Sequence, residues 1–161
     1  EQALLFENRL LEMLRKTDSL ATLAHLAYGS TYRAPVNVKP AKGIFLEYAP
    51  INRDYLKPLS DEHMQNLKEN LQVFPTNTAH ILEYWLDASM FSKWDRKNLV
   101  RVPWDKSSCD RDVKFYTDLG ISSITTFGTW MLNSDYFSKY GEDDTHQIVK
   151  EYGLILKRYL K

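Results

Sequence analysis

Acidic and aromatic side chains interrupt an apolar run at residues 79–89, AHILEYWLDAS. Successive side chains of a strand point to opposite faces, so Glu83, Trp85 and Asp87 would share one face. Two carboxylates on one face of an apolar strand are costly to bury without partners. They indicate either an edge strand whose polar face meets water or a strand whose polar face lines a cavity. The rest of the chain favours the cavity.

A third carboxylate, Glu47, lies in the preceding apolar run, 43–49, GIFLEYA. If the two runs form neighbouring strands, we expect Glu47, Glu83 and Asp87 to converge near their carboxyl ends. Paired carboxylates are the minimal equipment of glycoside hydrolysis, one acting as acid and the other as base or nucleophile. We therefore predict these three residues as the catalytic candidates. The alternative is structural pairing with basic side chains, namely Arg33, Arg53, His25 or Lys93.

Aromatic side chains make up 13% of the chain, and several follow the ends of apolar runs. Aromatic rings stack on flat or apolar ligand surfaces, including the apolar faces of sugars, so this bias favours a carbohydrate ligand. The alternative for any single ring is packing in the core. The predicted ligand contacts are Tyr28, Tyr48, Trp85, Trp94, Trp104 and Trp130, together with His25. For His25 the alternative is a hydrogen-bonded imidazole in the core.

Other chemistries lack their sequence signals. The chain contains no GxGxxG, Walker, HExxH or GxSxG motif. Its four histidines are too scattered for metal-ligand spacing. Cys109 is the only cysteine, which excludes an internal disulfide, and we interpret it as structural because no histidine lies near it in the sequence. We therefore expect neither a metal nor a cofactor.

Charge and length limit the classes of partner. Lys plus Arg and Asp plus Glu number 21 each, and this balance argues against nucleic acid or an anionic membrane as the main partner. No apolar run approaches the roughly 18 residues of a membrane span. The 161 residues fit one domain or fragment with its own core. Because the chain opens at Glu1 on helix-like sequence, we expect a processed product or an excised piece.

Helical periodicity alternates with short apolar runs along the chain. Helices are predicted over residues 2–16, 60–74, 110–119 and 145–160. Strands are predicted over residues 20–28, 43–49, 79–89 and 121–131. The loops that follow the strands are the long ones, including the basic and aromatic loop 90–106.

This alternation predicts an α/β fold with parallel strands and right-handed crossovers. Long loops after the strands are typical of a (β/α)8 barrel, where function lies on those loops. Four β/α units make half a barrel, and we assign residues 1–161 to the C-terminal half of a TIM-like barrel. A doubly wound open sheet is the structural alternative. Half a barrel exposes two sheet edges, so we expect the N-terminal half or another chain to cover them.

Three segments carry a resemblance: ILEYWLDASMFSKW at 81–94, VPW at 102–104 and DVKFYTDLGISSITTF at 112–127. They resemble the C-terminal half of the barrel in a bacterial domain-of-unknown-function family, similar to alpha-glucuronidase and beta-hexosaminidase barrels. The resemblance covers roughly the second half of the chain. It implies a glycoside hydrolase-like fold, a carbohydrate substrate and an extracellular or periplasmic location. It also implies Glu83 as nucleophile or stabilising acid, with Glu47 as a second contributor.

The sequence thus predicts part of a glycoside hydrolase-like domain that acts on or binds a glycan through acids at the ends of its strands. A non-catalytic carbohydrate-binding module on the same scaffold is one alternative, and an interaction scaffold is another. The distance between the two carboxyl groups discriminates: about 5–5.5 Å suits retaining cleavage and about 6.5–9.5 Å suits inverting cleavage. A closed sandwich without a pocket would favour the interaction scaffold.

Overall fold

The computed structural model describes residues 1–160, in which four strands form one all-parallel sheet. The strands are β1 (Leu23–Ala27), β2 (Ile44–Tyr48), β3 (His80–Glu83) and β4 (Ser123–Thr126), and they lie side by side in sequence order. The predicted α/β class, with parallel strands alternating with helices, is confirmed.

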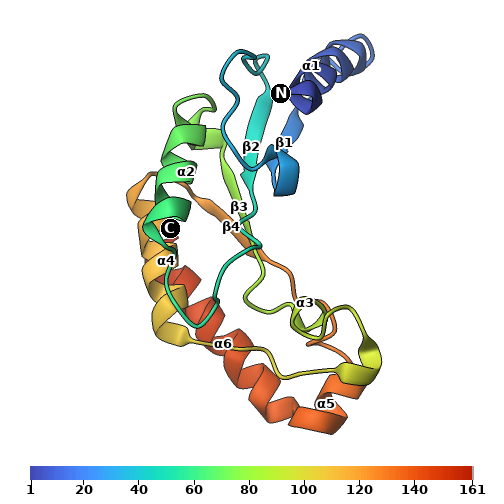
Figure 1. The fold of residues 1–161 in the computed structure, drawn as a ribbon, viewed down its shortest axis with the longest axis vertical. Helices are drawn as coiled ribbons and strands as arrows, with labels where there is room; N and C mark the ends of the chain where they lie inside the picture. The colour runs from blue at the N-terminus through green and yellow to red at the C-terminus, as the bar shows by residue number, and fades with distance from the viewer. Residues whose placement is uncertain (161) are drawn as a thin grey trace.

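The described chain also forms six α-helices. They are α1 (Gln2–Leu14), α2 (Asp61–Leu71), α3 (Ala88–Phe91), α4 (Lys106–Asp118), α5 (Ser134–Tyr140) and α6 (Glu142–Tyr159). Figure 1 shows an elongated molecule with the strands in its middle, α1 toward one end and α5 toward the other. Short 3-10 turns at 29–31, 76–78 and 96–98 occupy three of the connections.

All four strands are shorter in the structure than in the sequence interpretation, β3 and β4 by the most residues. The predicted strand 79–89 ends at Glu83, because Asp87 caps the start of α3 and turns the chain. The expectation that Glu83, Trp85 and Asp87 share one strand face is therefore wrong. The predicted strand 121–131 likewise ends at Thr126.

Side-chain caps explain why α4 begins earlier than predicted and why α5 forms in a segment predicted as a loop. The Asp105 carboxylate accepts from the Ser108 backbone N at 2.6 Å, so α4 begins at Lys106 rather than at residue 110. The Asn133 side chain accepts from the Tyr136 backbone N at 2.9 Å and starts α5, a helix in a segment predicted as a loop. Side-chain caps of this kind satisfy backbone N–H groups that have no partner within the helix.

The sheet has two unlike faces, which the strand register defines. His25, Leu46, Tyr48, Ile81, Glu83 and Ile124 point to one side, which we call the covered face. All six are buried against helices, whose buried side chains include Leu4, Leu11, Leu67, Val113 and Tyr116. Leu26, Phe45, Glu47, His80, Leu82 and Thr125 point to the other side, the open face, and all are half-buried or exposed. Helices therefore build the core on one face of the sheet only.

Gly43, which enters β2, provides a test of this packing. Its φ is +102°, and a methyl group on its Cα would lie 2.1 Å from Nη2 of Arg15. Arg15 donates to the carbonyl oxygens of Ala21 at 3.1 Å and Lys42 at 2.5 Å, so a shift of its guanidinium would disturb these two bonds. We expect Gly43→Ala to lower the free energy of unfolding by about 1–3 kcal/mol in urea denaturation.

Gly153 in α6 is the matched control, because a Cβ there would meet nothing within 4 Å. Gly153→Ala should raise the stability by about 0.5–1 kcal/mol through helix propensity alone. Equal stability of the Gly43→Ala variant and the wild type would contradict the described approach of Arg15 to β2.

Candidate functional site

The two strand carboxylates predicted as a catalytic pair lie on opposite faces of the sheet. Glu47 pairs with His80 of β3, and the next pair is Tyr48 with Ile81. Paired residues of a parallel sheet point to the same side, and successive residues alternate. Glu47 therefore points to the open face, while Glu83, two residues after Ile81, points to the covered face. The predicted convergence of Glu47 and Glu83 is wrong, because the pairing register sets their faces.

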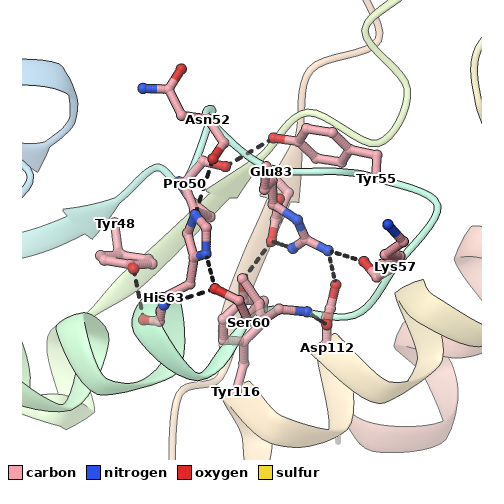
Figure 2. A network of polar contacts seen from close by, with 12 residues as sticks. Tyr48, Pro50, Asn52, Tyr55, Lys57, Ser60, His63, Glu83, Asp112 and Tyr116 are labelled. Carbon is pink, nitrogen blue, oxygen red and sulfur yellow. Dashed lines mark hydrogen bonds and ion pairs between the residues drawn. The ribbon is translucent and has the colours of Figure 1, made fainter.

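Glu83 is fully buried in a charged network between β3, the loop after β2 and α4 (Figure 2). Nη1 of Arg53 donates to Oε1 of Glu83 at 2.9 Å, and Nη2 donates to Oδ2 of Asp112 at 2.5 Å. The Tyr116 hydroxyl also donates to Oε1 of Glu83. The three charged side chains are at most 2% exposed. The ion pair of Glu83 with Arg53, one of the alternatives from the sequence, is confirmed.

Burial controls the protonation of this network. It raises the pKa of Glu83 to about 7, although the Arg53 guanidinium and the Tyr116 hydroxyl oppose the shift. Burial also raises the pKa of Asp112, again against the attraction of Arg53. Oε2 of Glu83 has no hydrogen-bond partner within residues 1–160, and an ionised carboxylate with such a buried oxygen is costly. One guanidinium thus holds two carboxyl groups, and Glu83 is partly protonated near neutral pH.

The same network fixes the long loop that leaves β2. Nη2 of Arg53 donates to the Lys57 carbonyl at 2.9 Å, and the Leu59 backbone N donates to Oδ1 of Asp112 at 2.8 Å. The first contact closes the loop on itself, and the second ties it to α4 (Figure 2). A side chain with no exposed surface does not contact a ligand from solvent, so the geometry gives Glu83 a positioning role.

Asp87, the third predicted acid, caps a helix. Its Oδ1 accepts from the Ser89 backbone N at 3.0 Å, the Ser89 hydroxyl at 2.5 Å and the Met90 backbone N at 3.3 Å. The carboxylate is buried and these three donors hold it at the start of α3. Asp87 therefore orients the loop after β3, which corrects its predicted place beside Glu83.

Aromatic side chains do gather on the open face, where the strands end. The rings of Tyr84 and Phe127 stack with their centroids 5.3 Å apart. Each follows a covered-face residue at a strand end, and the Phe127 backbone N donates to the Glu83 carbonyl at 2.9 Å. Burial raises the pKa of Tyr84 to about 12, and the charges of Tyr28, Asp87, Glu83 and Glu47 add smaller increases. By strand alternation Tyr28, which follows buried Ala27, and Glu47 point to the same open face. We call Tyr28, Glu47, Tyr84 and Phe127 the strand-end cluster.

Three members of the strand-end cluster are accessible. Tyr28 is 38% exposed, Phe127 is 41% exposed and Glu47 is half-buried, whereas Tyr84 is 7% exposed and supports Phe127 from beneath the surface. Unlike Glu83, Glu47 has no ion pair or hydrogen bond from its carboxylate within residues 1–160. The cluster therefore offers two kinds of contact on one surface, aromatic rings and one free carboxylate.

Three predicted ligand contacts pack inside the protein. Tyr48 is buried on the covered face, and its hydroxyl donates to the His63 carbonyl at 2.9 Å (Figure 2). Trp85 is 2% exposed and packs against α6. Trp104 is half-buried and donates from Nε1 to Glu151 at 2.8 Å. These contacts join strands and loops to helices, which corrects the predicted ligand-facing placement of Tyr48 and Trp85, while Trp104 stays a prediction.

The other two predicted tryptophans lie at the surface on neighbouring loops. Trp94, on the loop after β3, is 67% exposed. Trp130, on the loop after β4, is half-buried, and the Arg96 guanidinium carbon lies 5.6 Å from its ring centroid. The contact between Arg96 and Trp130 brings the two loops together at the end of the sheet where the strand-end cluster lies.

His25 faces the helices rather than a ligand at the strand ends. Its Nδ1 lies 2.6 Å from Oε2 of Glu7 in α1, and its ring stacks on Phe74 with centroids 5.1 Å apart. The residue is 3% exposed and pairs in register with Leu46 on the covered face. The alternative of a hydrogen-bonded core imidazole is confirmed.

Residues 1–160 contain no group of three His, Cys, Asp or Glu side chains placed to hold a metal ion. Cys109 is buried within α4, where burial raises the pKa of its thiol and disfavours a reactive thiolate. In the same range no helix combines the length and the apolar character needed to cross a membrane.

Comparisons of the chain with family models, curated proteins and solved structures find no match. The resemblance to a glycoside hydrolase-like barrel family therefore stays a prediction. The carbohydrate ligand and the extracellular or periplasmic location also stay predictions.

Sequence reasoning missed two members of the buried network. Asp112 and Tyr116 are four residues apart on α4, so they lie on the same face as buried Val113 and Cys109. A carboxylate on the apolar face of a helix is a signal for a buried ionic partner. That signal does not identify the partner, because Arg53 lies 59 residues away in the chain.

The protonation of Glu83 predicts how stability depends on pH. Its pKa in the folded protein, about 7, lies above the ordinary value of 4.5, so the folded state binds this proton more tightly. The contribution is complete below about pH 4.5 and is lost as the pH rises through about 7. We expect Glu83→Gln to reduce this fall, which for one proton is at most about 1.4 kcal/mol per pH unit.

Urea denaturation at about pH 5, 6, 7 and 8 measures this slope in the wild type and the Gln variant. Asp112, whose pKa is also raised, should leave a residual slope of the same sign in the variant. Identical slopes for both proteins would contradict a protonated, buried Glu83.

Proposed function

We propose that this protein binds a carbohydrate at the carboxyl ends of its strands, through the strand-end cluster on the open face. The observation that carries the proposal is the exposed ring of Phe127, stacked on Tyr84, on the face of the sheet that also carries the exposed ring of Tyr28 and the free carboxylate of Glu47. Exposed aromatic rings offer a flat apolar surface to a sugar ring, and a carboxylate accepts hydrogen bonds from its hydroxyls. Loops after parallel strands are also where such sheets place their ligands.

We further propose that the sheet is the C-terminal half of a (β/α)8 barrel. Its strand order follows the sequence without the reversal that defines a doubly wound sheet. All-parallel sheets occur almost only with both faces covered, whereas this sheet has helices on one face. Further β/α units, from the N-terminal half of the barrel or another chain, would cover the open face and pair with the edges of β1 and β4.

Taken by themselves, the described residues favour carbohydrate binding over hydrolysis. Hydrolysis of a glycosidic bond uses two carboxyl groups that flank the bond. Among the three predicted acids, only Glu47 faces the open side, since Glu83 is held by Arg53 and Asp87 caps α3. As a glycoside hydrolase, the protein would need a second acid from a segment that covers the open face. The non-catalytic alternative needs none.

Titration calorimetry with a panel of oligosaccharides tests the proposal. We expect Phe127→Ala and Glu47→Gln each to weaken binding by about tenfold or more, because each removes one kind of contact from the cluster. Reducing-sugar release by the same proteins reports hydrolysis, and Glu47→Gln should abolish any that is found.

Phe6→Ala is the matched control, since Phe6 is a 65% exposed aromatic residue on α1. It should leave the affinity unchanged. Binding that is equally strong in the Phe127→Ala variant and the wild type would refute the placement of the ligand. Failure of every oligosaccharide to bind the wild type would refute the function itself.

A further inference from the structure

A second surface adjoins the strand-end cluster, formed by the loops that follow β3 and β4. Arg96 on the first loop lies over the ring of Trp130 on the second, with 5.6 Å between guanidinium carbon and ring centroid. The second loop begins at Phe127, a member of the strand-end cluster. In Figure 1 the segment around α3 and the orange segment after β4 run together on the way to α5. A ligand at the strand ends would therefore reach this surface.

Backbone strain marks the same two loops. Within residues 1–160, the non-glycine residues with positive φ are Lys93 (54°), Trp94 (58°) and Trp130 (63°). A bulky side chain in this conformation is uncommon and costs roughly 1 kcal/mol or more. Strain of this kind collects at ligand-binding sites, and here it holds two tryptophans and one lysine at one end of the sheet.

The charge on this surface is positive and unbalanced. Lys93, Arg96 and Lys97 are exposed, and none of them has an ion-pair partner within the described chain. The one acid among them, Asp95, is engaged in accepting from the Lys97 backbone N at 2.9 Å and from the Asn98 side chain at 2.7 Å.

The remaining cations of the loop are paired. Arg101 bonds to Asp144, and Lys106 lies 3.5 Å from Glu151. In a chain whose acidic and basic residues are equal in number, the three unpaired cations are a local excess. We call Lys93, Arg96 and Lys97 the basic triplet.

We infer that the carbohydrate is acidic. The basic triplet binds the carboxylate or sulfate groups of this carbohydrate, and the sugar rings stack on the neighbouring aromatic side chains. This inference rests on the proposed function and specifies the ligand class of that site. Arg96 joins the two features, because it lies against Trp130 and keeps its guanidinium donors free of acidic partners. A neutral glycan would use the rings but leave the triplet unmatched, whereas an acidic glycan uses both.

Calorimetry with oligogalacturonides and with their methyl esters tests this inference, because the two ligands differ in charge but share their rings. We expect the acidic form to bind about tenfold or more tightly and to lose affinity as NaCl is added. Changing the basic triplet to glutamine should remove this preference and leave binding of the ester unchanged. A sulfated and an unsulfated chondroitin oligosaccharide form the second pair and distinguish sulfate from carboxylate recognition.

Lys16, Lys39 and Lys42 provide the charge-matched control, since all three are exposed on segments that lead into β1 and β2, at the other end of the strands. Their triple change to glutamine should keep the preference for acidic ligands. Equal affinity for oligogalacturonide and its ester, and for the sulfated and unsulfated chondroitin, would overturn this inference and leave the proposed function standing. Loss of the preference in the control variant would also overturn it. Binding of no oligosaccharide, charged or neutral, would overturn the proposed function and the inference together.

Discussion

A single guanidinium group buried between two carboxyl groups organises the end of this sheet. Arg53 reaches from the loop after β2 to Glu83 at the end of β3 and to Asp112 on α4. Removing one partner of such a buried pair leaves an uncompensated charge in a low-dielectric interior, which is why all three elements are held together. The network fixes the end of β3 and the loop after β2 against α4. It therefore positions the strand ends that carry the exposed residues.

The second constraint is the asymmetry of the sheet. Helices cover one face, and the alternation of side chains then assigns each strand residue to the core or to the open side. This places Glu83 in the core and Glu47, one strand away, among accessible aromatic rings. These residues therefore do not form a catalytic site that uses both acids. They do form a binding surface that uses Glu47 and its neighbouring rings.

Much of the fold was predictable from the sequence, but the face of the sheet to which each strand-end side chain points was not. Periodicity and breakers located all four strands and the alternation with helices, because these signals are local. The error at Glu83 had two sources: β3 stops where Asp87 begins to cap α3, and register depends on pairing across the chain. Tyr48 and Trp85 were assigned to a ligand from their position at strand ends, yet their faces direct them to helices. Ion pairing of Glu83 with Arg53 was foreseen only as an alternative.

Accessibility of the two glutamates tests the central claim most directly. Coupling of an amine to carboxyl groups with a water-soluble carbodiimide, followed by peptide mass spectrometry, reports which carboxylates reach solvent in the folded protein. The account predicts rapid modification of Glu47 and protection of Glu83 and Asp112 until the protein is unfolded in urea. Modification of Glu83 in the folded protein at a rate similar to that of Glu47 would contradict it.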